Sequence, residues 1–419
     1  MSSPQRVIQQ RRQYNQWVGN QTLEDFALRF TAQRARRGAF LVGNTALGAV
    51  SFLACEAIGG SITLAFGFAN AIAAIIAAGV VMFLVGLPIC AAATRNGVDV
   101  DLLTRGAGFG YIGSTITSLV YAMFTFILFS IEASIMSAAI VMVVHLPLWL
   151  ANIISALVVV PIAAFGIRAI SRVQFWTQPI WLTLQFGPLL YLAWTGLPDF
   201  ASWTQFTGSA GNTGISLLPF GMATSILLSL LPQVGEQVDY LRFLPERTRA
   251  NRTSWWAAML FAGPGWVFTG CAKLATGSFL TYLALERGVS WADAAQPATM
   301  FRVAYLEVFH NPALASGLML LFVVTCQIKI NTTNAYAGSI AWSNFFSRLT
   351  HSHPGRVVWV VFNVLLALLL MELGIFRVIQ SILGLYANFA VGWMGALAAD
   401  LVINKPLGLS PPGIEFKRA

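Results

Sequence analysis

Long apolar runs separated by short polar segments fill most of the chain. A helix needs about 20 apolar residues to cross the core of a bilayer, and each run approaches or exceeds that length. The pattern predicts an all-α polytopic membrane protein with ten transmembrane helices. The predicted spans are residues 39–65, 68–93, 110–143, 147–167, 174–196, 215–241, 254–283, 313–345, 356–372 and 375–403. Residues 39–403 thus form a predicted transmembrane core between an N-terminal segment (1–38) and a cytoplasmic tail (404–419).

Charged side chains are rare and fall mostly outside the apolar runs. The chain is 57% hydrophobic and 10% charged, whereas a soluble domain carries about 25% charged residues. The net charge is +9, but the basic residues lie in short loops and in the N-terminal segment. We therefore expect membrane lipid around the chain and no nucleic-acid partner.

The distribution of lysine and arginine predicts the orientation. With residues 1–38 inside, 20 of the 25 lysines and arginines fall in inside segments, and the outside loops hold only Arg287 and Arg302. Positive residues are enriched in cytoplasmic loops, so both termini are predicted to lie inside, with the chain in the inner or plasma membrane. Residues 1–38 lack a short apolar core with a small-residue cleavage site, so no cleaved signal peptide is expected.

Helices are also expected outside the spans. Residues 21–30 place Glu24 and Asp25 near the start and four apolar residues on one face, which predicts a short amphipathic helix against the cytoplasmic surface. The four apolar residues are Leu23, Phe26, Ala27 and Phe30. The outside segments 197–214 and 284–312 are each long enough to contain an interfacial helix.

The eighth predicted span carries a dense group of polar residues. Lys329, Asn331 and Asn334, with two threonines between them, follow the apolar run 313–325 without a break. Hydrogen bonding between helices is the simpler explanation for such residues. A lysine at bilayer depth needs a dedicated partner, however, so we favour a functional site.

The first predicted span is rich in glycine. Gly43, Gly48, Gly59 and Gly60 permit either close helix packing or a local break, and both interpretations are open. Helix packing alone does not explain Glu56, an ionisable residue inside the same span.

The sixth predicted span is interrupted by Pro232, with Gln233 and Glu236 just beyond it. A broken polar span of this kind, paired with a glycine-rich first span, is typical of a binding site near the midplane between two repeats. Gln233 is therefore a candidate substrate ligand. Asp239 and Arg242, three positions apart, are expected to pair at the inner interface.

The third predicted span places Tyr121, Thr125, Leu128 and Glu132 on one helix face, at steps of four, three and four. Tyr121 and Thr125 form a candidate aromatic shelf with a polar neighbour. For either residue alone, a core tyrosine and a backbone-bonded threonine are the simpler explanation.

Nothing in the sequence indicates catalysis. Cys55, Cys90, Cys271 and Cys326 all lie in apolar runs, where packing is a better explanation than disulfides or metal ligation. The sequence contains no phosphate-binding loop or nucleophile motif. We expect no enzyme activity, no cofactor and no bound metal.

Three segments resemble the nucleobase–cation symporter-1 family, which includes purine, cytosine, uracil, allantoin and hydantoin permeases. The segment Asn96–Gly110 resembles the family's loop between spans 2 and 3, and Asp239–Phe243 resembles the end of span 6. Asn331–Ser339 resembles the asparagine-rich start of the second half of span 8, and Gly59 and Gly60 match in span 1. The match is that of a divergent member.

This resemblance implies a five-plus-five inverted repeat with the substrate between broken spans 1 and 6 and spans 3 and 8. It assigns the aromatic shelf to Tyr121 with Thr125 beside it, and the ligand-binding amides to Asn331 and Asn334. The span 6 aromatic position holds Leu230, which cannot stack on a planar base. Family members usually have twelve spans, so peripheral spans 11 and 12 are absent here, and a longer polypeptide is one explanation.

The resemblance places the family's sodium site near Gly48 and Ser51 in span 1 and near Cys326 and Lys329 in span 8. The hydroxyl ligands of span 8 are not retained, and an ammonium at Lys329 would repel a bound cation. We therefore predict no sodium here and consider Lys329 a cation surrogate.

Proton coupling is the alternative to sodium. Lys329 would titrate with Glu56 or Glu132 nearby, and Glu236 is a further candidate for proton coupling. A purely structural ion pair of Lys329 is an equally supported interpretation.

These expectations combine into a secondary active transporter. It would move a small nitrogenous substrate, such as a nucleobase or related ring metabolite, by alternating access without sodium. The alternative is a transporter-like sensor module of a longer signalling protein. A kinase or other signalling domain continuing the chain at its C-terminus would favour the sensor.

Overall fold

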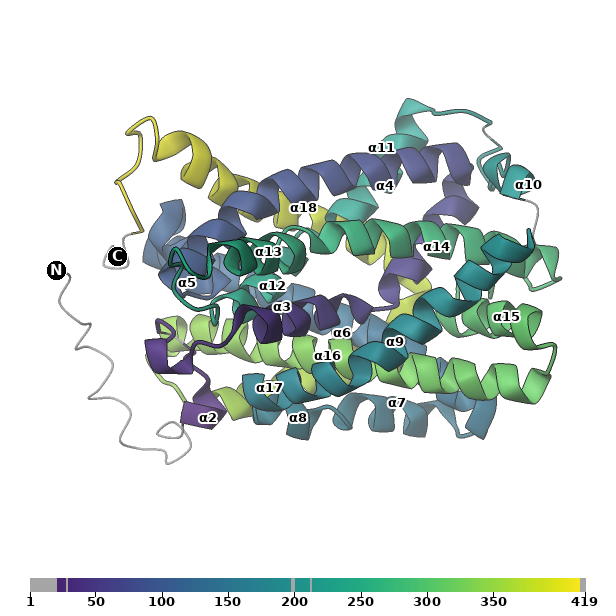
Figure 1. Cartoon of the computed structure of the whole chain (residues 1–419), viewed down its shortest axis with the longest axis horizontal. Coiled ribbons are helices and arrows are strands. Elements are labelled where there is room, and N and C mark those ends of the chain that lie inside the picture. Colours follow the sequence, from purple (N-terminus) through teal and green to yellow (C-terminus); the bar gives the residue numbers. More distant parts are fainter. Residues whose placement is uncertain (1–20, 28, 197–199, 212, 415–419) are drawn as a thin grey trace.

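The computed structural model describes residues 21–27, 29–196, 200–211 and 213–414, and these residues contain helices and no strand. Helices lie side by side along the long axis of the molecule, with α2 and α5 at one end and α10 at the other (Figure 1). The helices that bear on the site are α2 (Gln21–Glu24), α3 (Ala39–Gly48), α4 (Ala54–Asn96), α5 (Val100–Thr104), α6 (Gly110–Val144), α7 (Leu148–Leu157), α8 (Val160–Ala164), α9 (Ile167–Thr195), α11 (Leu217–Leu228), α12 (Gln233–Leu241), α13 (Arg252–Ala262), α14 (Trp266–Glu286), α16 (Pro312–Thr350), α17 (Arg356–Glu372) and α18 (Ile379–Ala399).

Length and composition identify five stretches of the described residues that could cross a membrane, or six if one pair bent by 118° counts as a single span. The five are Ala54–Asn96, Val100–Val144, Leu217–Leu241, Pro312–Thr350 and Ile375–Asn404. Large apolar side chains such as Ile112, Trp176 and Leu190 are exposed on the outside of the bundle, as expected for contact with lipid. The all-helical class is confirmed, and the count of ten spans stays a prediction.

The first predicted span is broken. α3 ends at Gly48, a short 3-10 turn covers Ala49–Ser51, and α4 begins at Ala54. The predicted spans 1 and 2 join at Gly67, where α4 bends with φ 78° and the backbone of Thr207 approaches too closely for a side chain.

Gly59 packs against another helix rather than marking the break. A Cβ at Gly59 would collide with the Leu274 backbone of α14, and a Cβ at Gly277 would collide with the Glu56 backbone. Gly59 and Gly277 therefore let α4 and α14 approach closely, which favours helix packing as the role of Gly59.

The sixth predicted span is broken as expected. α11 ends at Leu228, and α12 begins at Gln233 after Pro232. The eighth predicted span is the continuous 39-residue helix α16, which packs along α6 and α17. α16 also contacts the turn Ala49–Ser51 and α12, so the two broken spans and this polar helix lie in one bundle.

Helices outside the spans follow the sequence in part. Both long outside segments contain a helix, α10 (Phe200–Thr204) and α15 (Pro297–Phe309). Near the N-terminus, α2 covers only four residues. Asp25 and Phe26 then adopt φ of 47° and 62°, so the described part of residues 21–30 is not one helix. Glu24 and Asp25 are buried because they bond to groups inside the bundle.

Candidate functional site

The break before α4 is held by a carboxylate. Glu132 on α6 accepts hydrogen bonds from the backbone N–H groups of Leu53 at 3.0 Å and Ala54 at 2.9 Å. The first N–H groups of a helix have no partner within the helix, and a negative charge there also interacts favourably with the helix dipole. Glu132, a candidate for proton coupling, thus stabilises the broken backbone of span 1.

Asparagine side chains of α16 and α17 have unused polar atoms in the interior. Asn331 Nδ2, Asn334 Oδ1 and Asn363 Nδ2 are buried and have no hydrogen-bond partner in the described part of the chain. The side chains of Asn331 and Asn334 lie within 3.5 Å of each other. Each unsatisfied buried polar group costs about 1–3 kcal/mol, so these atoms are candidates to bond a ligand or water.

The predicted shelf on α6 is tied to its neighbours. The Tyr121 hydroxyl donates to Asp239 Oδ2 at 2.9 Å, and its ring centre lies 5.7 Å from that of Trp393. The Thr125 hydroxyl lies 3.2 Å from Asn363 Oδ1, which brings the predicted polar neighbour beside an unsatisfied amide. Leu230 is fully buried in the break between α11 and α12.

Glu236 of α12 contributes a further buried oxygen without a hydrogen-bond partner in the described structure. Gln233 donates to Glu236 at 2.9 Å, while the other oxygen of Glu236 is buried without a partner in the described structure. Glu132 and Glu236 lie close enough for their charges to repel each other. The interior between the two breaks therefore combines carboxylates with amide groups that have unused bonding capacity.

The residues assigned to the sodium site lie where the break of span 1 meets α16 and α9. Ser51 Oγ donates to the backbone carbonyl of Cys326 at 3.2 Å, which joins the break of span 1 directly to α16. Gly48 lies against the side chain of Gln174, which leaves no room for a Cβ. The structure thus joins Ser51 to Cys326 and places Gly48 against Gln174, and the cation site stays a prediction.

Lys329 points toward α9. Its ammonium donates to Gln178 Oε1 at 2.9 Å, to Thr177 Oγ1 at 3.2 Å and to the carbonyl of Gln174 at 3.3 Å. It lies 5.7 Å from the ring centre of Trp181. All three acceptors are neutral oxygens. The carboxylates expected to titrate with Lys329 bond elsewhere: Glu132 accepts from the backbone at the start of α4, and Glu56 accepts from Lys273.

The partner of Glu56 is a lysine that the sequence did not single out as a site residue. Lys273 Nζ lies 2.7 Å from Glu56 Oε1 and 2.9 Å from Gln185 Oε1, and Gln185 also donates to Glu56 at 2.9 Å. All three side chains are fully buried. This triad joins α4, α9 and α14. The only signal in the sequence was the presence of an ionisable residue inside each of two distant apolar runs.

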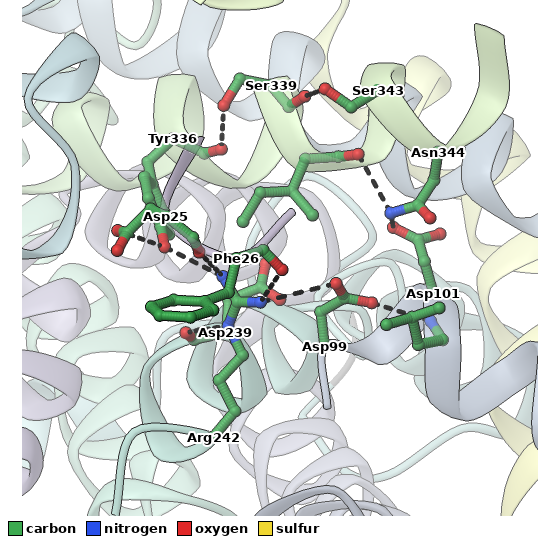
Figure 2. Close-up of polar contacts among 12 residues, drawn as sticks. Asp25, Phe26, Asp99, Asp101, Asp239, Arg242, Tyr336, Ser339, Ser343 and Asn344 are labelled. Atoms are coloured by element: carbon green, nitrogen blue, oxygen red, sulfur yellow. Dashed lines mark hydrogen bonds and ion pairs between the residues drawn. The ribbon is translucent and has the colours of Figure 1, made fainter. Parts of the chain in front are cut away.

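The three segments that resemble the symporter family meet at the end of the bundle that carries α2. Arg242 is fully buried and lies 3.6 Å from Asp99 of the first segment and 3.1 Å from the hydroxyl of Tyr336 of the third (Figure 2). Its guanidinium also donates to the carbonyls of Asp25 and Phe26 at 3.0 and 3.3 Å. This network ties the N-terminal segment to α12 and α16.

The expected pairing of Asp239 with Arg242 is wrong. Arg242 Nε donates to the backbone carbonyl of Asp239 at 3.1 Å, and the Asp239 carboxylate instead accepts from Tyr121. The spacing of three positions permits such a pair, but the carboxylate that pairs with Arg242 is that of Asp99, from a distant segment. In the same region Asp101 accepts from Asn344 at 3.3 Å (Figure 2).

Solved structures share this arrangement of helices. Mhp1, a nucleobase-cation-symport-1 family transporter solved in a closed conformation with bromovinylhydantoin bound, has a TM-score of 0.66 and 19% identity, over 90% of this chain and 80% of that one. Its inward-facing conformation gives 0.64 and 18%, over 90% and 79%. The chain has the fold of secondary symporters.

The likeness extends beyond that family. A Na⁺-coupled sialic acid symporter in a substrate-bound outward-open state has a TM-score of 0.60 and 12% identity, over 92% of this chain and 84% of that one. No family model matches the chain, and no curated protein matches its sequence. The resemblance seen in the sequence is thus confirmed at the level of the fold, and the apolar helices indicate an integral membrane protein.

Proposed function

We propose that this protein is a secondary active transporter that moves a small nitrogenous substrate by alternating access. The observation that carries the proposal is a set of buried side-chain atoms of Asn331, Asn334 and Asn363 that have no hydrogen-bond partner among the described residues. Amides both donate and accept hydrogen bonds, which suits a compound with adjacent N–H and C=O groups, such as a nucleobase or hydantoin. Broken helices, present here in spans 1 and 6, are typical of transporter binding sites.

The substrate ligands that we propose are Tyr121, Thr125, Gln233, Asn331 and Asn334. Leu230 would supply an apolar wall to the site rather than a stacking ring. No enzymatic step forms part of the proposal.

Transport is proposed to be independent of sodium. Ser51 and the Cys326 carbonyl bond to each other, and Lys329 is held 2.9 Å from Gln178 beside them. When charged, the Lys329 ammonium would provide the positive charge that a sodium ion brings, and it would then disfavour a bound sodium ion. Glu236, with one carboxylate oxygen unpartnered in the described structure, is the proposed group for proton coupling.

The end of the bundle that carries α2 is proposed to face the cytoplasm. The basic residues of loops and the N-terminal segment support this orientation. Arg242 and its partners would then close the cytoplasmic side of the site in this structure.

A transporter-like sensor is the second candidate function. It is favoured by Leu230, which replaces an expected aromatic ring, and by Lys329, which replaces a coupling ion. A sensor would bind its ligand without accumulating it in vesicles, which distinguishes it from a transporter.

The test is thermal stabilisation of the purified protein by nucleobases, hydantoins, allantoin and amino acids, with and without sodium. A ligand at about 100 times its Kd should stabilise the protein by about 2.7 kcal/mol. Asn334→Leu should abolish that stabilisation, whereas Asn388→Leu should not, because Asn388 is exposed on α18. Uptake of the ligand into vesicles then separates the transporter from the sensor.

The sodium arm of this experiment tests Lys329. We expect the same ligand stabilisation with and without sodium in the native protein. Sodium-dependent binding that persists undiminished in Lys329→Ala would refute the surrogate role. Stabilisation by no compound of the panel would count against the nitrogenous substrate class.

A further inference from the structure

A pocket of about 200 Å³ lies at the end of the bundle that carries α2. Four arginines line it, together with one carboxylate, Asp25, and a group of apolar side chains. The arginines are Arg34, Arg36, Arg37 and Arg168, and the apolar residues include Phe26, Phe165, Ile167 and Phe243. The pocket is separate from the substrate site between the broken helices.

The backbone around the arginines is fixed by contacts to the loop after α12. The N–H of Arg37 donates to the carbonyl of Phe243 at 2.8 Å. The Arg36 guanidinium donates to the carbonyl of Leu244 at 3.2 Å, and its Nε is buried without a partner in the described structure. These contacts hold this part of the pocket in place before any ligand binds.

Two of the arginines that line the pocket, Arg37 and Arg168, repel each other. Burial lowers the pKa of Arg37, Asp25 raises it, and the neighbouring charge of Arg168 lowers it further. The carboxylate of Asp25 is already engaged, since it accepts from the Ile167 N–H at 2.7 Å and the Tyr336 hydroxyl at 2.9 Å. An anion between Arg37 and Arg168 would relieve their repulsion.

The position of α9 adds to this preference. α9 begins at Ile167, so the positive end of the dipole of a 29-residue helix lies at the pocket beside Arg168. The ring of Phe165, 58% exposed, lines the same pocket. The pocket thus offers guanidinium groups beside an apolar surface.

We propose that this pocket binds a phosphate group, carried either by an anionic phospholipid or by a small soluble phosphate ester. Arginine presents a planar set of donors that matches phosphate oxygens in bidentate geometry. The same residues 25 and 26 line the pocket and bond to Arg242, so an occupied pocket would also hold the N-terminal segment in place.

The test uses the full chain in zwitterionic phosphatidylcholine nanodiscs. Binding of added phosphatidylglycerol is measured by native mass spectrometry, and binding of glycerol 3-phosphate by isothermal titration. Arg37→Gln and Arg168→Gln should each weaken binding of the ligand about tenfold, the equivalent of about 1.4 kcal/mol. Arg249→Gln is the matched control, because Arg249 is exposed in a loop nearby and is not part of the pocket.

The outcomes separate the two sources of phosphate. Arginine-dependent binding of phosphatidylglycerol alone assigns a lipid headgroup, and binding of glycerol 3-phosphate assigns a soluble ester. Equal losses in Arg249→Gln would show general attraction to positive charge and overturn the proposal, as would binding of neither compound. Melting of each variant without ligand checks that it is folded, and Arg168, which is exposed, provides a variant with little effect on packing.

Discussion

The two buried lysines have opposite surroundings. Lys273 lies 2.7 Å from the Glu56 carboxylate, whereas the acceptors bonded to Lys329 are neutral oxygens. Removing a charge from water is costly, and a close opposite charge offsets much of that cost. Lys273 and Glu56 therefore depend on each other, while Lys329 depends on the dipoles of α9 around it.

We predict that Lys273→Met and Glu56→Gln each destabilise the protein by about 3–5 kcal/mol, because each leaves an uncompensated buried charge. The double variant should recover part of that loss, since it leaves no lone charge. Thermal melting in detergent measures all three. Arg287→Gln is the control, because the Arg287–Glu307 pair is partly exposed and such pairs contribute about 1 kcal/mol or less. Strictly additive losses in the double variant would argue against the pair.

At the scale of elements, residues 23–27 connect helices that are far apart in the sequence. We call them the crossing segment. The carbonyl of Leu23 accepts from Arg356 of α17 at 2.8 Å, and Asp25 accepts from the first residue of α9 and from α16. These hydrogen bonds involve the backbone and the Asp25 carboxylate of the crossing segment. Hydrogen bonds, and not apolar burial alone, therefore hold the segment in place.

Glu24 makes the crossing segment sensitive to acid. Its carboxylate accepts from the Arg356 N–H at 2.8 Å and lies 2.7 Å from His353 Nε2. Burial alone would raise the pKa of Glu24, but the hydrogen bond and charge of His353 and the contacts of Arg356 together lower it below its ordinary value of 4.5. A lowered folded pKa stabilises the protein above the unfolded pKa, and that stability is lost as pH falls through the folded value.

We therefore predict that Glu24→Gln melts at a lower temperature than the native protein at pH 7. The difference should shrink as the pH falls below about 4.5, because protonated Glu24 resembles the glutamine. Melting temperatures of both proteins across this range test the prediction. A difference that stays constant with pH would mean that packing, rather than charge, is responsible.

At the scale of the whole molecule, the features predicted correctly from the sequence are those that a short stretch of residues determines, such as helix bends and breaks. The bend at Gly67 falls between predicted spans 1 and 2, and the break before α12 falls at Pro232, because hydropathy and proline act within one segment. The partners of Lys273 and Arg242 were missed because they come from segments more than a hundred residues away. Gly59 was ambiguous for a related reason, since only the approach of α14 decides between packing and a break.

If the protein works by alternating access, weakening the hydrogen bonds of the crossing segment should open the interior of the bundle more often. Cys326 is fully buried on α16 beside the break of span 1, so in a single-cysteine protein its thiol reports opening. Asp25→Asn weakens the bonds to Tyr336 and Ile167, and each 1.4 kcal/mol removed from the closed state should raise the rate of thiol labelling about tenfold. Cys90, fully buried on α4, is the control in a second single-cysteine protein. Faster labelling at Cys326 but not at Cys90 indicates opening of the site, whereas equal acceleration at both would indicate general loosening of the fold and contradict a gating role for the segment.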